Sequence, residues 1–68
     1  MFEVRVKPSN AAYCQLTEFS DWDSAAEFAR LAGGCIGIDD IGIYDETGYM
    51  LAYYDLETNI LVPNVFYI

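Results

Sequence analysis

The sequence predicts a small α+β domain in which one helix packs on a mostly antiparallel sheet, with its elements in the order ββαβββ. Two patterns predict this fold. Apolar residues recur at the two-residue period of strands in residues 2–7 and 36–55, and at helical spacing in residues 21–33. A chain of 68 residues is near the lower limit for an independent core, so we assign residues 1–68 to a single domain.

The first two predicted strands form a hairpin. Residues 2–7 alternate strictly, with three apolar residues on one face and Glu3, Arg5 and Lys7 on the other. The Pro-Ser-Asn sequence at residues 8–10 is typical of a turn. A second strand is predicted over residues 11–19, with Cys14 and Leu16 on the same face.

The segment from Ser20 to Gly34 predicts the helix. Asp21 is suited to the N-cap, and Ser24 with Glu27 offers an alternative capping box one turn later. The Gly33–Gly34 pair is expected to end the helix at a residue with positive φ. The apolar stripe that would face the sheet, extended by Trp22, consists of Ala25, Phe28, Ala29 and Ala32.

The second half of the chain predicts three further strands. Four isoleucines at residues 36, 38, 41 and 43 change parity at Asp39–Asp40, where a β-bulge would keep all four pointing inward. Residues 45–48 form a hairpin turn with Gly48 in the left-handed position, and residues 49–55 return. After a turn at residues 56–59, a last strand begins at Ile60, and residues 65–68 are expected to resume it at an edge.

The strongest chemical signal is acidity. Eleven acids and three bases give a net charge of −8. Residues 1–30 hold all three bases and five acids, whereas residues 31–68 hold six acids and no base. Such a chain repels nucleic acid and anionic membranes and attracts basic protein surfaces. The alternative is that the acids are scattered and only increase solubility.

The sequence offers few of the residues that usually act as general bases or nucleophiles in enzymes. It contains no histidine, and its lone lysine, Lys7, lies on a predicted exposed strand face, where an amine is poorly desolvated and activated. Neither cysteine has a base evident in the sequence that would generate a thiolate. Asp39, Asp40, Asp45 and Glu46 are carboxylates that a hard cation would accept, but their spacing fits no calcium loop. We therefore expect no catalytic activity, no cofactor and no obligatory metal.

The start of the chain has no hydrophobic leader-like stretch, and no apolar run reaches the length of a membrane span. We therefore expect a cytoplasmic protein of a bacterial host cell. Cys14 and Cys35 are expected to be reduced, buried thiols rather than a disulfide. Formation of a homodimer would be one further way for so small a chain to bury apolar surface.

The candidate partner-binding residues come from the half of the chain without bases. Side chains at i and i+2 of a strand lie about 6.6 Å apart on one face, as for Asp55 and Glu57, so a sheet can display carboxylates as nucleic acid displays phosphates. Exposed tyrosines next to such charges would supply apolar anchors. The candidates are Asp39, Asp40, Asp45, Glu46, Asp55 and Glu57, with Tyr49 and Tyr53 as the anchors.

Residues 20–57 resemble the small phage-encoded anti-CRISPR proteins that inhibit type I surveillance complexes. The resemblance lies in the capped helix SDWDSAAEFARLAGG, in Cys35 just after it, and in a hairpin whose return strand reads MLAYYD. It implies a non-enzymatic inhibitor that docks on the guide-RNA–protein complex and stops target DNA binding. This chain differs in its scarcity of lysine and its greater acidity, which favours direct competition with DNA phosphates for basic residues.

Two other classes of function remain open from the sequence. The chain is also compatible with a small accessory or structural subunit of a phage or mobile element that uses its acidic face in assembly. An antitoxin-like protein that neutralises a basic toxin or nuclease would have the same composition. All three classes share a basic protein surface as the partner, without direct contact to nucleic acid or membrane.

Overall fold

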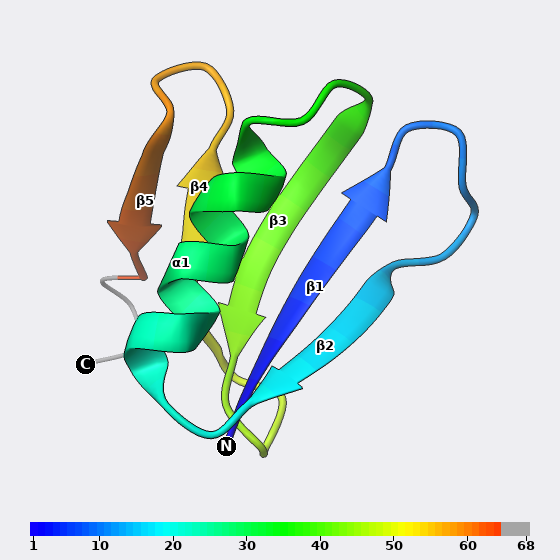
Figure 1. Cartoon of the computed structure of the whole chain (residues 1–68). Coiled ribbons are helices and arrows are strands. Elements are labelled where there is room, and N and C mark those ends of the chain that lie inside the picture. Colours follow the sequence, from blue (N-terminus) through cyan, green and yellow to red (C-terminus); the bar gives the residue numbers. More distant parts are fainter. Residues whose placement is uncertain (65–68) are drawn as a thin grey trace.

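A five-stranded antiparallel sheet carries one helix on one of its faces (Figure 1). The computed structural model describes residues 1–64. The elements are β1 (Phe2–Pro8), β2 (Gln15–Phe19), α1 (Trp22–Gly33), β3 (Ile38–Tyr44), β4 (Met50–Asp55) and β5 (Ile60–Pro63). The predicted fold class and element order are confirmed. The expected continuation at residues 65–68 lies outside the described residues.

The strand order is β2-β1-β3-β4-β5, so β1 lies between β2 and β3 and pairs antiparallel with both. Strands β2 and β3 are therefore parallel to each other, and the connection between them must cross β1. Helix α1 makes this crossing, which places it over the middle of the sheet (Figure 1).

The core lies between α1 and the sheet. Val4, Ile41 and Ile43 are fully buried, and they pack against two small helix residues, Ala25 and Ala29. Alanines let the helix approach the strands closely, so that a thin core is still densely packed. Two aromatic pairs cover the end of the interface at which the cross-strand partners Phe2 and Phe19 lie: Phe2 contacts Trp22, and Phe19 contacts Phe28.

The helix begins as predicted. The Asp21 carboxylate accepts a hydrogen bond from the Ser24 amide at 2.9 Å, which satisfies one of the free N–H groups of the first turn. The apolar stripe of the helix that faces the sheet is wider than predicted, because Ala26 is also buried. Trp22 extends it only partly, since 37% of the residue is exposed.

The predicted conformation of the helix end is wrong. Gly34 caps the helix with φ −83°, which is right-handed, and the positive φ occurs at Gly37. Packing explains the first glycine of the pair instead. A Cβ at Gly33 would overlap the buried ring of Tyr54. The helix end therefore needs a glycine because an aromatic ring of β4 packs directly on its backbone.

Strand β2 is shorter than predicted and begins at Gln15 rather than residue 11. Pro8 has no N–H to donate, and the amide of Ser9 donates to the Gly37 carbonyl at 2.8 Å, so the chain after β1 is held by the segment before β3. Cys14 consequently lies in a loop. Cys14 and Cys35 form no disulfide, but both are exposed, so the prediction of buried thiols is wrong.

The β-bulge at the two aspartates is confirmed. Lys7 lies opposite Asp40 and Pro8 opposite Ile38, so Asp39 is the extra residue of β3. The bulge turns Ile38 toward the core together with Ile41 and Ile43, whereas Ile36 is fully exposed. The prediction that all four isoleucines point inward is wrong at Ile36, because this residue precedes the strand.

The β3–β4 hairpin turn at residues 45–48 is confirmed, with Gly48 at φ 89°. The second hairpin, β4–β5, turns at residues 56–59, as predicted, with Asn59 at φ 60°. In the described part of the chain, no helix has the length and apolar character that crossing a membrane requires.

Candidate partner-binding surfaces

The β3–β4 hairpin carries five of the six predicted acids to its two opposite ends, and the sixth, Glu57, follows in the β4–β5 turn. Asp39 and Asp40 begin β3, and the turn after it holds Asp45 and Glu46. Asp45 lies five residue steps along the chain from Asp40, which corresponds to about 17 Å of extended strand. Because β4 runs back antiparallel, Asp55 returns to the end where β3 begins. The acids thus form two groups rather than one continuous array.

The first group lines an open hollow of about 480 Å³ at the β4–β5 turn, which we call the acidic hollow. Asp39 comes from β3, Tyr53 and Asp55 from β4, and Glu57 from the turn. Four of the eight predicted residues therefore lie around one concave surface, although they come from three segments. Asp40 follows Asp39 in β3 and is exposed.

Two carboxylates of the acidic hollow are held by hydrogen bonds. The Ser9 hydroxyl donates to Asp39 Oδ1 at 2.6 Å, and Lys7 Nζ lies 3.9 Å from Asp39 Oδ2. Asp55 Oδ1 accepts a hydrogen bond from the Glu57 amide at 3.0 Å, which fixes the start of the turn. Lys7 is the one base paired with this group among residues 1–64, so the hollow keeps a negative balance.

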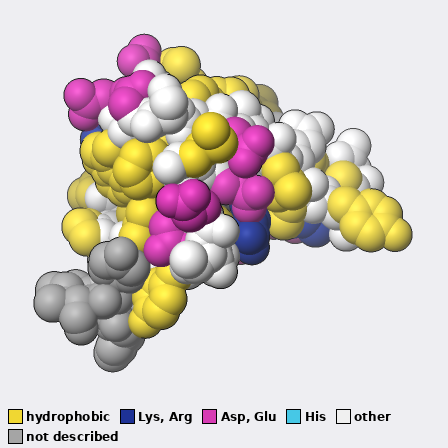
Figure 2. All heavy atoms as spheres, turned by 90° about the horizontal axis from the view of Figure 1, so that it is seen from below, with side chains coloured by type: hydrophobic (Ala, Val, Ile, Leu, Met, Phe, Trp, Pro, Cys, Tyr) yellow, Lys and Arg dark blue, Asp and Glu magenta, His cyan; other side chains and the backbone are white. Residues whose placement is uncertain are grey.

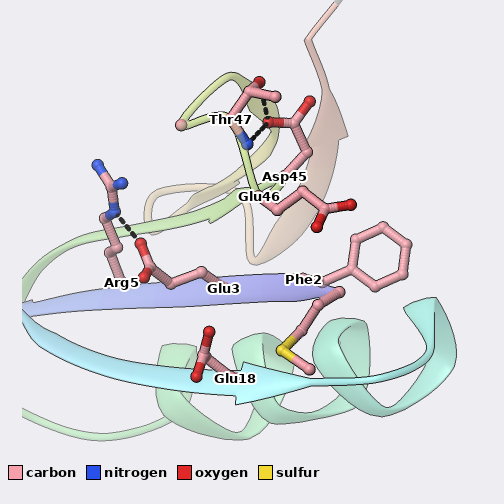
Figure 3. Close-up of a pocket in the computed structure, with 9 residues that line it drawn as sticks. Phe2, Glu3, Arg5, Glu18, Asp45, Glu46 and Thr47 are labelled. Atoms are coloured by element: carbon pink, nitrogen blue, oxygen red, sulfur yellow. Dashed lines mark hydrogen bonds and ion pairs between the residues drawn. The ribbon is translucent and has the colours of Figure 1, made fainter.

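The second group belongs to a smaller cavity of about 270 Å³ at the opposite end of the sheet, shown in Figure 3. Glu3 and Glu18 lie directly opposite each other on β1 and β2, and Asp45 and Glu46 reach the cavity from the β3–β4 turn. The sequence analysis did not propose Glu3 or Glu18. The alternation of residues 2–7 identified the outward face of Glu3, but its pairing with Glu18 depends on where β2 begins.

Arg5 compensates part of the charge in this cavity. Its Nε lies 2.6 Å from Glu3 Oε1 (Figure 3). Its guanidinium lies 3.9 Å from the centre of the Tyr44 ring. The hydrogen bond that Arg5 donates to the Glu3 carboxylate raises the pKa of the Arg5 guanidinium. The Tyr44 ring in turn occupies the space where Gly42 has no side chain. Arg5 is thus fixed between a carboxylate and an aromatic ring.

The Asp45 carboxylate stabilises the β3–β4 turn. Its Oδ1 accepts hydrogen bonds from the Thr47 amide and hydroxyl and from the Tyr49 amide, at 2.9, 2.6 and 3.0 Å. These bonds, with the Thr47 hydroxyl as the largest contribution, lower the pKa of the Asp45 carboxyl. Asp45 therefore retains its negative charge to lower pH than an ordinary aspartate.

The two tyrosines proposed as anchors are separated. Tyr53 is 40% exposed and lies beside the acidic hollow, whereas Tyr49 is 49% exposed and precedes β4 at the other end of the hairpin. The end of the molecule that carries the β3–β4 turn shows acidic side chains in several groups, with hydrophobic side chains between them (Figure 2). Charged and apolar side chains are therefore mixed on this surface.

Within residues 1–64, no group of three or more histidine, cysteine, aspartate or glutamate residues is arranged to hold a metal ion. The carboxylates of both groups are largely at the surface, where water can solvate their charge.

The chain matches no protein-family model, and the searches of curated proteins and of solved structures gave no significant match.

Proposed function

We propose that this chain is a non-enzymatic inhibitor that binds the basic surface of a nucleic-acid-binding complex and thereby blocks DNA binding. The acidic hollow is the observation that supports this function best. It brings Asp39, Asp55 and Glu57 around the exposed ring of Tyr53. A partner with clustered arginines and lysines would exchange DNA phosphates for these carboxylates.

Desolvation decides how strong such contacts are. Exposed ion pairs contribute little, but a carboxylate that accepts a hydrogen bond from an arginine inside an interface contributes about 1.5–3 kcal/mol. Tyr53 would exclude water next to these pairs, because its ring is a rigid apolar surface. The acidic hollow thus combines carboxylates with an apolar ring that would exclude water from their ion pairs.

A type I CRISPR surveillance complex is the partner that we propose, within the cytoplasm of a bacterial host. The resemblance of residues 20–57 to small phage anti-CRISPR proteins supports this choice. The negative charge supports the mode of action, because the path of DNA through such a complex is lined by basic residues that neutralise phosphates.

Competition with DNA is the decisive test. A purified type I surveillance complex is given fluorescent target DNA, and its DNA binding is measured by anisotropy as the concentration of this protein increases. We expect mutually exclusive binding, with an affinity for the complex that falls steeply as salt rises from low to physiological concentration. Simultaneous occupancy of the complex by DNA and this protein would overturn the proposal.

A charge-neutralised variant sharpens the test. Asp39→Asn with Asp40→Asn should weaken inhibition at least about tenfold, the equivalent of about 1.4 kcal/mol. The fold should persist, since both residues are exposed and asparagine can still accept the Ser9 hydrogen bond. The matched control removes two exposed acids of α1, Asp23→Asn with Glu27→Gln, and should inhibit nearly as well as the parent. Equal inhibition by the parent and both variants would contradict a role for the acidic hollow.

A further inference from the structure

The face of the sheet opposite α1 is covered by no other element within residues 1–64 (Figure 1). Side chains alternate between the two faces of a strand, and Val4 and Val6 point to the helix. Arg5 and its direct cross-strand partners therefore point the other way. We call this surface the open face.

A row of apolar and aromatic side chains crosses the open face at one level. The register places Leu16 of β2 opposite Arg5 of β1, Arg5 opposite Gly42 of β3, Gly42 opposite Tyr53 of β4, and Tyr53 opposite Val62 of β5. The glycine position is not empty, because the Tyr44 ring covers it. The row spans four inter-strand spacings, or about 19 Å.

Much of this row is available to a partner. Leu16 is 59% exposed and Tyr53 is 40% exposed, although both are large apolar side chains. Arg5 stacks on the Tyr44 ring at 3.9 Å, so the middle of the row presents a flat, ordered surface rather than a mobile cation. Ordered aromatic and arginine side chains are typical of the centres of protein–protein interfaces.

Carboxylates border the row on both sides. On one side, Glu3 and Glu18 lie opposite each other, two residues along the strands from Arg5 and Leu16. On the other side, Asp40 lies two residues from Gly42. The border at Glu3 and Glu18 contains no base of its own, and Arg5 of the row pairs with Glu3. The other border contains one base, Lys7, which lies opposite Asp40, pairs with Asp39 and donates to the Pro8 carbonyl, so that its two aspartates exceed its single base. The open face therefore has an apolar centre between two negative borders.

We propose that the open face is the docking surface for a basic protein segment, whose apolar side chains cover the row from Leu16 to Val62 and whose lysines or arginines meet the two acidic borders. Charge complementarity identifies this occupant. A second copy of the chain would bring a net charge of −8 and the same acidic borders against this face. The inference rests on the proposed function for the nature of the partner, and it adds the face on which the partner binds, next to the acidic hollow through Tyr53.

Methyl NMR with a defined probe tests the location of the site. The probe is a synthetic amphipathic lysine–leucine peptide, and its control is a lysine–serine peptide of equal length and charge. We expect the lysine–leucine peptide to shift the methyl signals of Leu16 and Val62 and to leave those of Leu31 and Ile36, which are exposed outside the open face, unchanged. The lysine–serine peptide should bind about tenfold more weakly, because it buries no apolar surface.

A pair of double variants tests the same site independently. Leu16→Ser with Tyr53→Ser should lower the affinity for the lysine–leucine peptide about tenfold. The control, Leu31→Ser with Ile36→Ser, removes two side chains that are still more exposed, at 67% and 101%, and should bind within about twofold of the parent. Methyl mapping of the parent does not depend on these variants, so a folding defect in either of them leaves the test intact.

The outcomes separate this inference from the proposed function. If the peptide shifts the methyl signals of Leu31 and Ile36 instead of those of Leu16 and Val62, the inference is overturned. It is also overturned if the Leu16 and Val62 signals shift in the same way when the protein alone is concentrated, because the occupant would then be a second copy. DNA displacement by the Leu16→Ser, Tyr53→Ser variant as strong as that by the parent would refute the docking face and the role of Tyr53 in the acidic hollow, and would leave the inhibition by the carboxylates. Peptide binding on the open face without any DNA displacement would refute the inhibitor function and support the docking face.

Discussion

At the scale of single residues, several acids stabilise the chain locally as well as contributing to its charge. Asp21 bonds the Ser24 amide at the start of α1, Asp45 bonds the Thr47 and Tyr49 amides, and Asp55 bonds the Glu57 amide. Each carboxylate satisfies backbone donors where a helix begins or a hairpin turns. The protein therefore obtains part of its negative charge from residues that its turns and cap require.

Asp45 provides a pH-dependent prediction. Its folded pKa lies below the unfolded value, so its stabilising effect is fully present above the unfolded pKa and is lost as pH falls through the folded pKa. Asp45→Asn keeps an oxygen acceptor but does not titrate. We expect the parent to melt at a higher temperature than this variant at pH 7, with the difference shrinking below about pH 4. Thermal melts of both proteins between pH 7 and pH 2 measure this, and a constant difference would contradict it.

The isoleucines provide a second prediction at this scale. Ile43 is fully buried and Ile36 fully exposed, so the same substitution should have very different effects. Ile43→Ala should cost about 2–5 kcal/mol of unfolding free energy, because it leaves a cavity under α1. Ile36→Ala should change it by less than about 0.5 kcal/mol. Urea unfolding of both variants checks the contrast, and similar losses would mean that Ile36 is covered in solution.

At the scale of elements, packing rather than backbone conformation explains the glycine pair that ends α1. Gly33 has its backbone against the Tyr54 ring of β4, whereas a Cβ at Gly34 would lie in ordinary contact, 3.6 Å from the Leu31 carbonyl oxygen. Tyr54 is buried in the core, so it has little room to move away. A side chain at Gly33 would therefore force either the Tyr54 ring or the end of the helix to move.

Adjacent alanine substitutions test this explanation. Gly33→Ala should destabilise the protein by about 1–3 kcal/mol, because the new methyl group displaces the Tyr54 ring. Gly34→Ala has right-handed backbone geometry and free space, so it should be neutral or slightly stabilising through the reduced entropy of the unfolded chain. Differential scanning calorimetry distinguishes the two. If both variants melt like the parent, close packing does not explain Gly33.

At the scale of the whole molecule, self-repulsion of the acids limits stability. The chain measures 30 × 23 × 20 Å and carries a net charge of −8. At about 0.01 M ionic strength the Debye length is about 30 Å, so acids at both ends of the hairpin repel one another, whereas at about 0.15 M it is about 8 Å. Repulsion between the two acidic groups is therefore largely removed at physiological salt.

We accordingly expect the melting temperature to rise when sodium chloride is raised from about 0.01 M to about 0.15 M. Potassium chloride should have the same effect, because screening does not distinguish the two cations. The Asp23→Asn, Glu27→Gln variant should show a smaller rise, since it carries two fewer charges. A melting temperature that falls with salt would mean that attractive ion pairs, such as Arg5 with Glu3, outweigh the repulsion.

The sequence by itself determined the elements and most of their limits. The alternation around Val4, the N-cap at Asp21, the bulge at Asp39 and the left-handed Gly48 are local properties, because each depends on side-chain period or on backbone geometry within a few residues. The candidate acids were also recognisable, since the absence of bases after residue 30 is visible in composition alone.

Only the tertiary structure decided which of these residues meet. It joined Asp39, Tyr53 and Glu57 in one hollow, placed Asp45 with Glu3 at the opposite end, and left Ile36 exposed. It also arranged the row on the open face, which depends on the register of five strands at once. Register is fixed by contacts between residues far apart in the chain, such as Val4 with Ile43, because a shift of one residue would turn every buried side chain outward. No local pattern contains that information.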